Sequence, residues 1–135
     1  MSVFLDTNVI VYAFDGAEPA KQRVAIEILE AGDRLVVSTQ VLLETWWVLT
    51  RKLETPLDDD SASKVIEELS ALPVVATDPE LVRRAIDTGR RFHLAVWNAL
   101  IIEAARTAGC RRVLSEDLNS GQDFDGVMVE NPFTD

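Results

Sequence analysis

Four polar residues occupy positions where a folded protein usually places apolar side chains. They are Asp6, Glu44, Asn98 and Asp117. Each lies inside or shortly after an apolar run, and Glu44 is the only charged residue between positions 41 and 50. Because a carboxylate in apolar surroundings is costly unless it is paired or binds a metal ion, these four positions are the first candidates for chemistry.

Each of the four also has a purely structural interpretation. Asp6 could cap a helix over residues 8–14, and Glu44 could pair with a buried arginine. Asn98 could be a core amide bonded to the backbone, and Asp117 could be a solvated turn residue. Taken singly the four signals are weak, but their joint spacing favours a shared site.

The apolar pattern predicts strands and helices in alternation. Five short strands are expected, over residues 2–5, 35–38, 74–76, 112–115 and 127–130. The longer helices are expected over residues 19–31, 41–53, 61–72, 80–91 and 94–108. This alternation predicts a three-layer α/β/α fold with a mainly parallel central sheet of about five strands. We expect residues 1–135 to form one domain, because domains typically contain ~100–150 residues.

These elements should bring the four residues to one edge of the sheet. Asp6 and Asp117 follow the first and fourth strands, and parallel sheets bind ligands outside the carboxyl ends of their strands. Glu44 lies in the first turns of the helix after the second strand, and Asn98 lies early in the helix before the fourth. Oxygen ligands without a set of histidines or cysteines suit Mg²⁺ or Mn²⁺. Such an ion could activate water and stabilise charge on a phosphoryl group.

The overall charge restricts the kind of partner. The chain has 23 acidic and 13 basic residues, a net charge of −10. Nucleic-acid-binding proteins are usually basic, so charge alone favours a basic protein partner or plain solubility, and approach to a polyphosphate would need a bound cation.

Other features of the sequence indicate the cellular compartment of the protein. The single cysteine, Cys110, excludes an internal disulfide and a cysteine zinc site. No apolar run reaches the ~18 residues that cross a bilayer, and the first residues lack the basic flank of a signal peptide. A cytoplasmic protein without membrane association is expected.

Four sequence blocks resemble those of PIN-domain ribonucleases, most closely the VapC toxins of bacterial toxin–antitoxin modules. The blocks are Leu5–Asn8, Ser38–Glu44, Trp97–Ile101 and Leu114–Leu118, with Gly121-Gln122 and Asn131-Pro132-Phe133 behind them. The resemblance covers nearly the whole chain. It implies a PIN-like fold and a Mg²⁺- or Mn²⁺-dependent endoribonuclease that hydrolyses RNA phosphodiester bonds. It also implies a homodimer that a cognate antitoxin protein neutralises.

By motif position, the resemblance assigns Asp6, Glu44 and Asp117 as the acids that bind the catalytic metal. Thr7 and Ser115 match the small hydroxyl residues beside that site, where they would orient the ligands. These roles are expectations carried over from the family, residue by residue.

Asn98 completes the expected catalytic and metal-binding set, but it departs from the family pattern. The family has an aspartate at this position. The exchange keeps an oxygen ligand and removes a negative charge, which predicts weaker metal binding, a less acidic bound water and an attenuated or inactive enzyme.

Two other functions fit parts of the sequence. A catalytically weak PIN-like domain could act as a binding module for a protein partner, and metal-dependent cleavage would distinguish it from a nuclease. A phosphoacceptor domain, similar to a response-regulator receiver, would need an aspartate after a strand in the middle of the sheet. The third strand is followed by Thr77-Asp78-Pro79, which fits a helix cap better.

Overall fold

The computed structural model describes residues 2–134 and contains one five-stranded sheet. The strands are β1 (Ser2–Leu5), β2 (Arg34–Ser38), β3 (Val74–Val75), β4 (Arg112–Leu114) and β5 (Met128–Glu130). They lie in the order β3-β2-β1-β4-β5, and every neighbouring pair is parallel. The expectation of a mainly parallel sheet of about five strands is confirmed.

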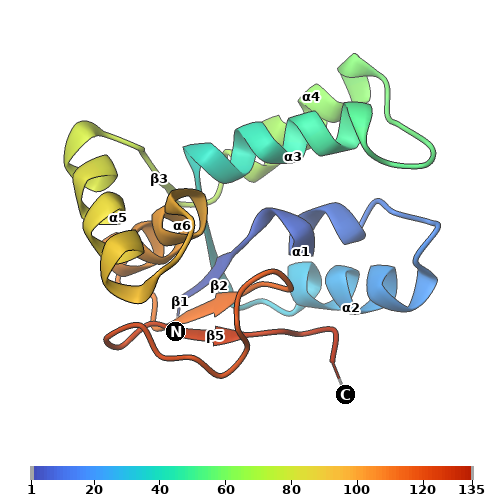
Figure 1. Cartoon of the computed structure of the whole chain (residues 1–135). Coiled ribbons are helices and arrows are strands. Elements are labelled where there is room, and N and C mark those ends of the chain that lie inside the picture. Colours follow the sequence, from blue (N-terminus) through green and yellow to red (C-terminus); the bar gives the residue numbers. More distant parts are fainter. Residues whose placement is uncertain (1, 135) are drawn as a thin grey trace.

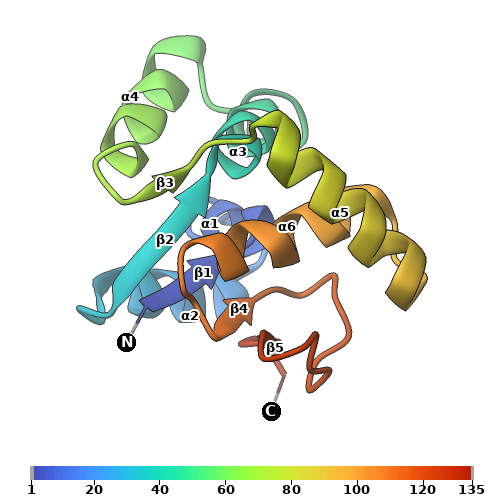
Figure 2. The ribbon, with the colours of Figure 1, turned by 90° about the vertical axis from the view of Figure 1, so that its left-hand side faces the viewer.

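Six helices within the described residues accompany the sheet. They are α1 (Thr7–Tyr12), α2 (Pro19–Glu30), α3 (Thr39–Arg51), α4 (Asp59–Leu69), α5 (Pro79–Phe92) and α6 (Val96–Thr107). Figure 1 and Figure 2 show α1 and α2 on one side of the sheet and α5 and α6 on the other, which gives the three expected layers. Helix α3 begins directly after β2 and passes over α1 (Figure 1). None of the helices within residues 2–134 is long and apolar enough to cross a membrane.

Helices α4 and α6 begin at other residues than the sequence predicts, one because of its cap and one because of the backbone before it. Helix α4 begins at Asp59 rather than residue 61, since the Asp58 carboxylate accepts a hydrogen bond from the Ser61 backbone N–H at 2.7 Å. Helix α6 begins only at Val96, because Ala95 before it has a non-helical backbone conformation, with φ −58° and ψ 140°. The segment between α5 and α6 is therefore a turn, in place of the first helical residues expected there.

The central strands are buried on both faces, which explains why they contain unbroken apolar runs. Val3, Phe4 and Leu5 of β1 are all buried, as is the whole of β2 after Arg34. The side chains that pack on them come from the helices of both outer layers. Most of the buried polar side chains among the described residues, such as Asp6, Ser38 and Ser115, lie where a strand ends, while Thr45 and Glu103 are buried within helices.

The strand order creates one reversal point in the sheet. The chain runs from β1 outward to β2 and β3, and then returns to the other side of β1 to form β4 and β5. Ligands of open parallel sheets bind at such a reversal, outside the carboxyl ends of the strands. Asp6 follows β1 there, and its backbone N–H donates to the Leu114 carbonyl at the end of β4 at 3.0 Å.

Candidate active site

Asp6 is a buried carboxylate, with 5% of its surface exposed. Its Oδ1 accepts a hydrogen bond from the Thr7 backbone N–H at 2.7 Å, so Asp6 is the N-cap of α1, as the structural interpretation predicts. Its Oδ2 accepts from the Ser115 hydroxyl, also at 2.7 Å. Burial raises the pKa of Asp6 and outweighs these two hydrogen bonds, and the charge of Asp117 adds to the rise. Capping and a role in the site are thus compatible.

Asn8 connects the two strand ends, and sequence reasoning missed this role. Its Nδ2 donates to Asp117 Oδ2 at 3.1 Å and lies 3.4 Å from Ser115 Oγ. Its Oδ1 accepts from the Glu116 backbone N–H at 3.0 Å. The only signal in the sequence was an amide two residues after Asp6. Through Asn8, α1 fixes the loop that carries Asp117.

Glu44 reaches the site from α3 and is not buried, so the expectation of apolar burial is wrong. Its apolar neighbours Leu43 and Trp47 are themselves 72% and 49% exposed. Its Oε1 accepts a hydrogen bond from Thr7 Oγ1 at 3.2 Å, and none of the ion pairs within residues 2–134 involves it. Partial desolvation raises the pKa of Glu44, and the charge of Asp6 raises it further.

Asn98 lies in the first turn of α6 and is half-buried. Its side chain makes no hydrogen bond within the described part of the chain, so it is not the backbone-bonded core amide of the structural interpretation. The predicted helix over residues 94–108 would place Leu94 one turn before Asn98, but α6 begins only after Leu94. The Asn98 amide is therefore free to contact a ligand.

The candidate residues line one cavity of about 380 Å³. They are Asp6, Thr7, Glu44, Asn98 and Asp117, together with Asn8. Ser115 is fully buried behind them, where its hydroxyl donates to Asp6 and accepts from the Asp117 backbone N–H at 3.1 Å. The structure thus brings together all four residues that the apolar pattern singled out.

The oxygen ligands of this cavity fit a divalent cation that keeps several of its waters better than a cation that only protein side chains ligate. Within residues 2–134, no three acidic, histidine or cysteine side chains lie close enough together to ligate one ion. Mg²⁺, however, usually keeps several waters and takes only one or two carboxylates. Desolvation is the main cause of the raised pKa of Asp6 and of Glu44, and the repulsion from neighbouring carboxylates that adds to it would fall when a cation enters.

A second group of side chains holds Glu116, the residue before Asp117. Lys21 Nζ lies 2.7 Å from Glu116 Oε2, and the Tyr12 hydroxyl donates to Glu116 Oε1 at 2.6 Å. Lys21 also donates to the Tyr12 oxygen at 3.3 Å. This group, which sequence reasoning missed, connects α1 and α2 to the loop after β4.

Comparison with known proteins agrees with this geometry. A family model described as "PIN domain" matches residues 3–122. No curated protein matches the chain. Among solved structures, a Mycobacterium tuberculosis VapC20 described as a sarcin–ricin loop cleaving toxin is 18% identical, with a TM-score of 0.68, and the match covers 85% of this chain and 89% of that one.

Two complexes are similar to the same degree. A toxin–antitoxin complex from Klebsiella pneumoniae has a TM-score of 0.71 at 18% identity, over 96% of this chain and 97% of that one. A DNA-bound VapBC from Salmonella typhimurium has a TM-score of 0.67 at 16% identity, over 98% of both chains. At these identities the likeness concerns the fold.

Proposed function

This chain belongs to the PIN-domain family, and from that premise we propose that it is a VapC-type toxin, a metal-dependent endoribonuclease that acts on RNA in the cytoplasm. PIN-domain proteins are nucleases as a family, and they generally use a divalent metal. The observation that carries the proposal is the convergence of Asp6, Glu44, Asn98 and Asp117 on one cavity at the reversal point of the sheet.

Within this proposal the side chains have distinct roles. Asp6, Glu44 and Asp117 would hold Mg²⁺ or Mn²⁺ with Asn98 as a neutral oxygen ligand. When bound, such an ion makes water more acidic and balances charge on the scissile phosphate. Ser115 keeps the Asp6 carboxylate oriented from behind, and Thr7 does the same for Glu44.

Asn98 makes the proposed enzyme an attenuated one. Its amide supplies an oxygen without a charge, so the site has three carboxylates where the family pattern has four. We therefore expect Asn98→Asp to raise the rate of RNA cleavage by orders of magnitude, at ~1.4 kcal/mol of transition-state stabilisation per tenfold. The measurement is cleavage of total RNA by both forms with Mn²⁺, Mg²⁺ or EDTA.

The control for this experiment is the double variant Asn98→Asp with Asp6→Asn, which removes a charge from the same cavity. It should be inactive and still folded, because aspartate and asparagine are nearly isosteric. If Asn98→Asp is as inert as the original chain on all RNAs tested, the nuclease proposal fails. A catalytically weak binding module for a protein partner would then replace it.

An antitoxin protein is the partner that this proposal requires. Two of the similar structures are toxin–antitoxin or VapBC complexes. The cavity presents several carboxylates in a chain of net charge −10, so an inserted lysine or arginine would relieve their repulsion and exclude both metal and RNA.

We also propose that two copies of the chain form a homodimer through the outer face of α3. Leu43 and Trp47 lie four residues apart on this helix and are 72% and 49% exposed. Large exposed apolar side chains in contiguous positions are typical of protein–protein interfaces. The homodimer is independent of the catalytic proposal.

A further inference from the structure

The cavity continues along α3 on both sides of Glu44. Gln40, Glu44, Val48 and Lys52 all line it, each four residues after the last. Residues four apart share one face of a helix, so these side chains form a strip along one wall. At 1.5 Å per residue the strip is roughly 18 Å long. This is more than a metal site needs, and the two ends of the strip differ in chemistry.

Trp97 lies at the Gln40 end of the strip. It also lines the cavity, immediately before Asn98, and its side chain is 66% exposed. The Gln40 amide donates to the Trp97 carbonyl at 3.2 Å, which ties the first turn of α6 to the start of α3. No aromatic pair or cation–π contact among residues 2–134 involves this indole, so its ring is open to a planar ligand.

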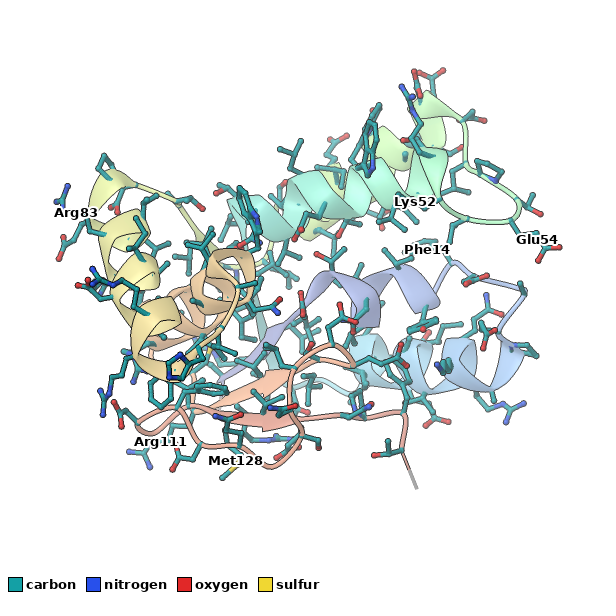
Figure 3. All side chains as sticks on the ribbon, in the orientation of Figure 1. Phe14, Lys52, Glu54, Arg83, Arg111 and Met128 are labelled. Carbon is teal, nitrogen blue, oxygen red and sulfur yellow. The ribbon has the colours of Figure 1, made fainter. Side chains whose placement is uncertain are left out.

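Lys52 lies at the opposite end. Of the described residues that line the cavity, it is the only cation, and none of the ion pairs within residues 2–134 uses it. Figure 3 shows it at the C-terminal end of α3, above Phe14 in the segment that follows α1. An ammonium group there can bind a phosphate in a cavity that otherwise repels anions.

We propose that this strip is a binding groove for single-stranded RNA, with one base stacked on Trp97 and a backbone phosphate at Lys52. The groove specifies how the proposed nuclease would bind its substrate, and it rests on that proposed function, because the phosphate to be cleaved would lie between these two contacts, beside Glu44. A single strand fits this chemistry, since its bases can unstack and pack on an aromatic ring. The two contacts also explain how so acidic a chain can hold RNA.

The stacking contact is tested with a fluorescein-labelled RNA hexamer, whose anisotropy is measured in Mg²⁺ and, separately, in EDTA. Trp97→Leu, which keeps an apolar side chain without a ring, should weaken binding about tenfold, within the range known for one stacked base. Trp97→Phe should retain most of the affinity. Val96→Ala, the matched control beside it on α6, should bind as the original chain does. Unlabelled RNA should quench tryptophan emission, and Trp97→Phe should abolish the quenching.

The phosphate contact is tested with the same RNA at several salt concentrations. Lys52→Gln should weaken binding several-fold and reduce the slope of log affinity against log salt by about 0.7, the value for one phosphate of a single strand. Lys52→Arg should restore both. Arg83→Gln removes the same charge from α5, where the side chain does not line the cavity and lies far from Lys52 (Figure 3), and it should leave the slope unchanged.

Three results would overturn the groove. They are no RNA binding by the original chain, equal binding by Trp97→Leu, and a halved molecular mass of Trp97→Leu in sedimentation, which would place Trp97 in a subunit interface. Cleavage by Asn98→Asp is scored separately. If that variant cleaves RNA while Trp97→Leu binds normally, the groove is wrong and the nuclease proposal stands. If Asn98→Asp is inert while both contacts matter, the nuclease proposal fails and RNA binding remains.

Discussion

Glu44 adds a negative charge to a cavity wall that already faces Asp6 and Asp117. Its effect on the free energy of unfolding of the protein should therefore depend on pH. Below its ordinary pKa of 4.5 the carboxyl is protonated in both the folded and the unfolded chain and costs nothing. Because desolvation and neighbouring charge raise the pKa of Glu44 in the folded state, ionisation costs the folded protein stability as the pH rises through that raised value.

We therefore expect the melting temperature of Glu44→Gln, minus that of the original chain, to increase as the pH rises from about 4.5 to 7.5, with both proteins in EDTA. Glu67→Gln, on the exposed surface of α4, is the matched control and should give a constant difference. Added Mn²⁺ should stabilise Glu44→Gln less than the original chain. A variant that is clearly less stable at pH 7 without metal would indicate a structural role for Glu44.

The single residues of the site differ in how far the sequence predicts them. Asp6 and Asp117 follow from the strand pattern, because each stands just beyond a buried strand. The role of Asn8 does not, since its contact with Asp117 joins residues 109 positions apart, and an amide carries no preference that identifies such a partner. The sequence correctly predicts that Glu44 lies in the helix after the second strand. It does not predict that Glu44 is exposed, because α3 carries apolar residues on two faces.

At the scale of elements, the loop after β4 is held from two helices at once. Asn8 of α1 contacts Asp117, while Lys21 of α2 pairs with Glu116. Hydrogen bonding to Glu116 raises the pKa of Lys21, so its ammonium group is charged at neutral pH. The helices thereby set the position of the Asp117 carboxylate relative to β1.

We expect Lys21→Met to weaken Mn²⁺ binding about tenfold, the lower end of the effect of residues that orient metal ligands. The melting temperature should change little, because the Lys21–Glu116 pair is partly exposed and such pairs contribute little. Calorimetric titration with Mn²⁺ measures the first effect, and Lys64→Met on α4 is the control. Unchanged Mn²⁺ affinity in Lys21→Met would mean that Asn8 alone positions Asp117.

The order of the elements was predictable because each carries a local signal. Apolar runs identify the strands, and Asp78 before Pro79 identifies the start of α5, whereas the start of α4 was expected two residues late, at residue 61. The starts of α3 and α6 were less predictable. Ser38 and Thr39 could both cap α3, and the structure uses Ser38, whose hydroxyl accepts from the Val41 N–H at 3.3 Å. Helix α6 has no side-chain cap at all.

At the scale of the whole molecule, charge and apolar surface act in opposite directions on self-association. Each chain carries a net charge of −10, so two copies repel each other at long range. The outer face of α3 offers the opposing force, because burying Leu43 and Trp47 removes large apolar side chains from water. The proposed homodimer should therefore become tighter as added salt screens the repulsion.

We expect Leu43→Glu to convert a dimer of 15.0 kDa chains into monomers, because it places a charge in the centre of the proposed interface and leaves it without a partner. Sedimentation velocity at low and moderate salt measures the mass. Ile86→Glu is the matched control: Ile86 is 45% exposed on α5, away from α3, and its replacement should leave the dimer intact. The fold of Leu43→Glu should persist, since residue 43 contributes its side chain to the surface. A dimer that survives Leu43→Glu but dissociates on Ile86→Glu would move the interface to α5, and a chain that is monomeric at every concentration would refute the homodimer.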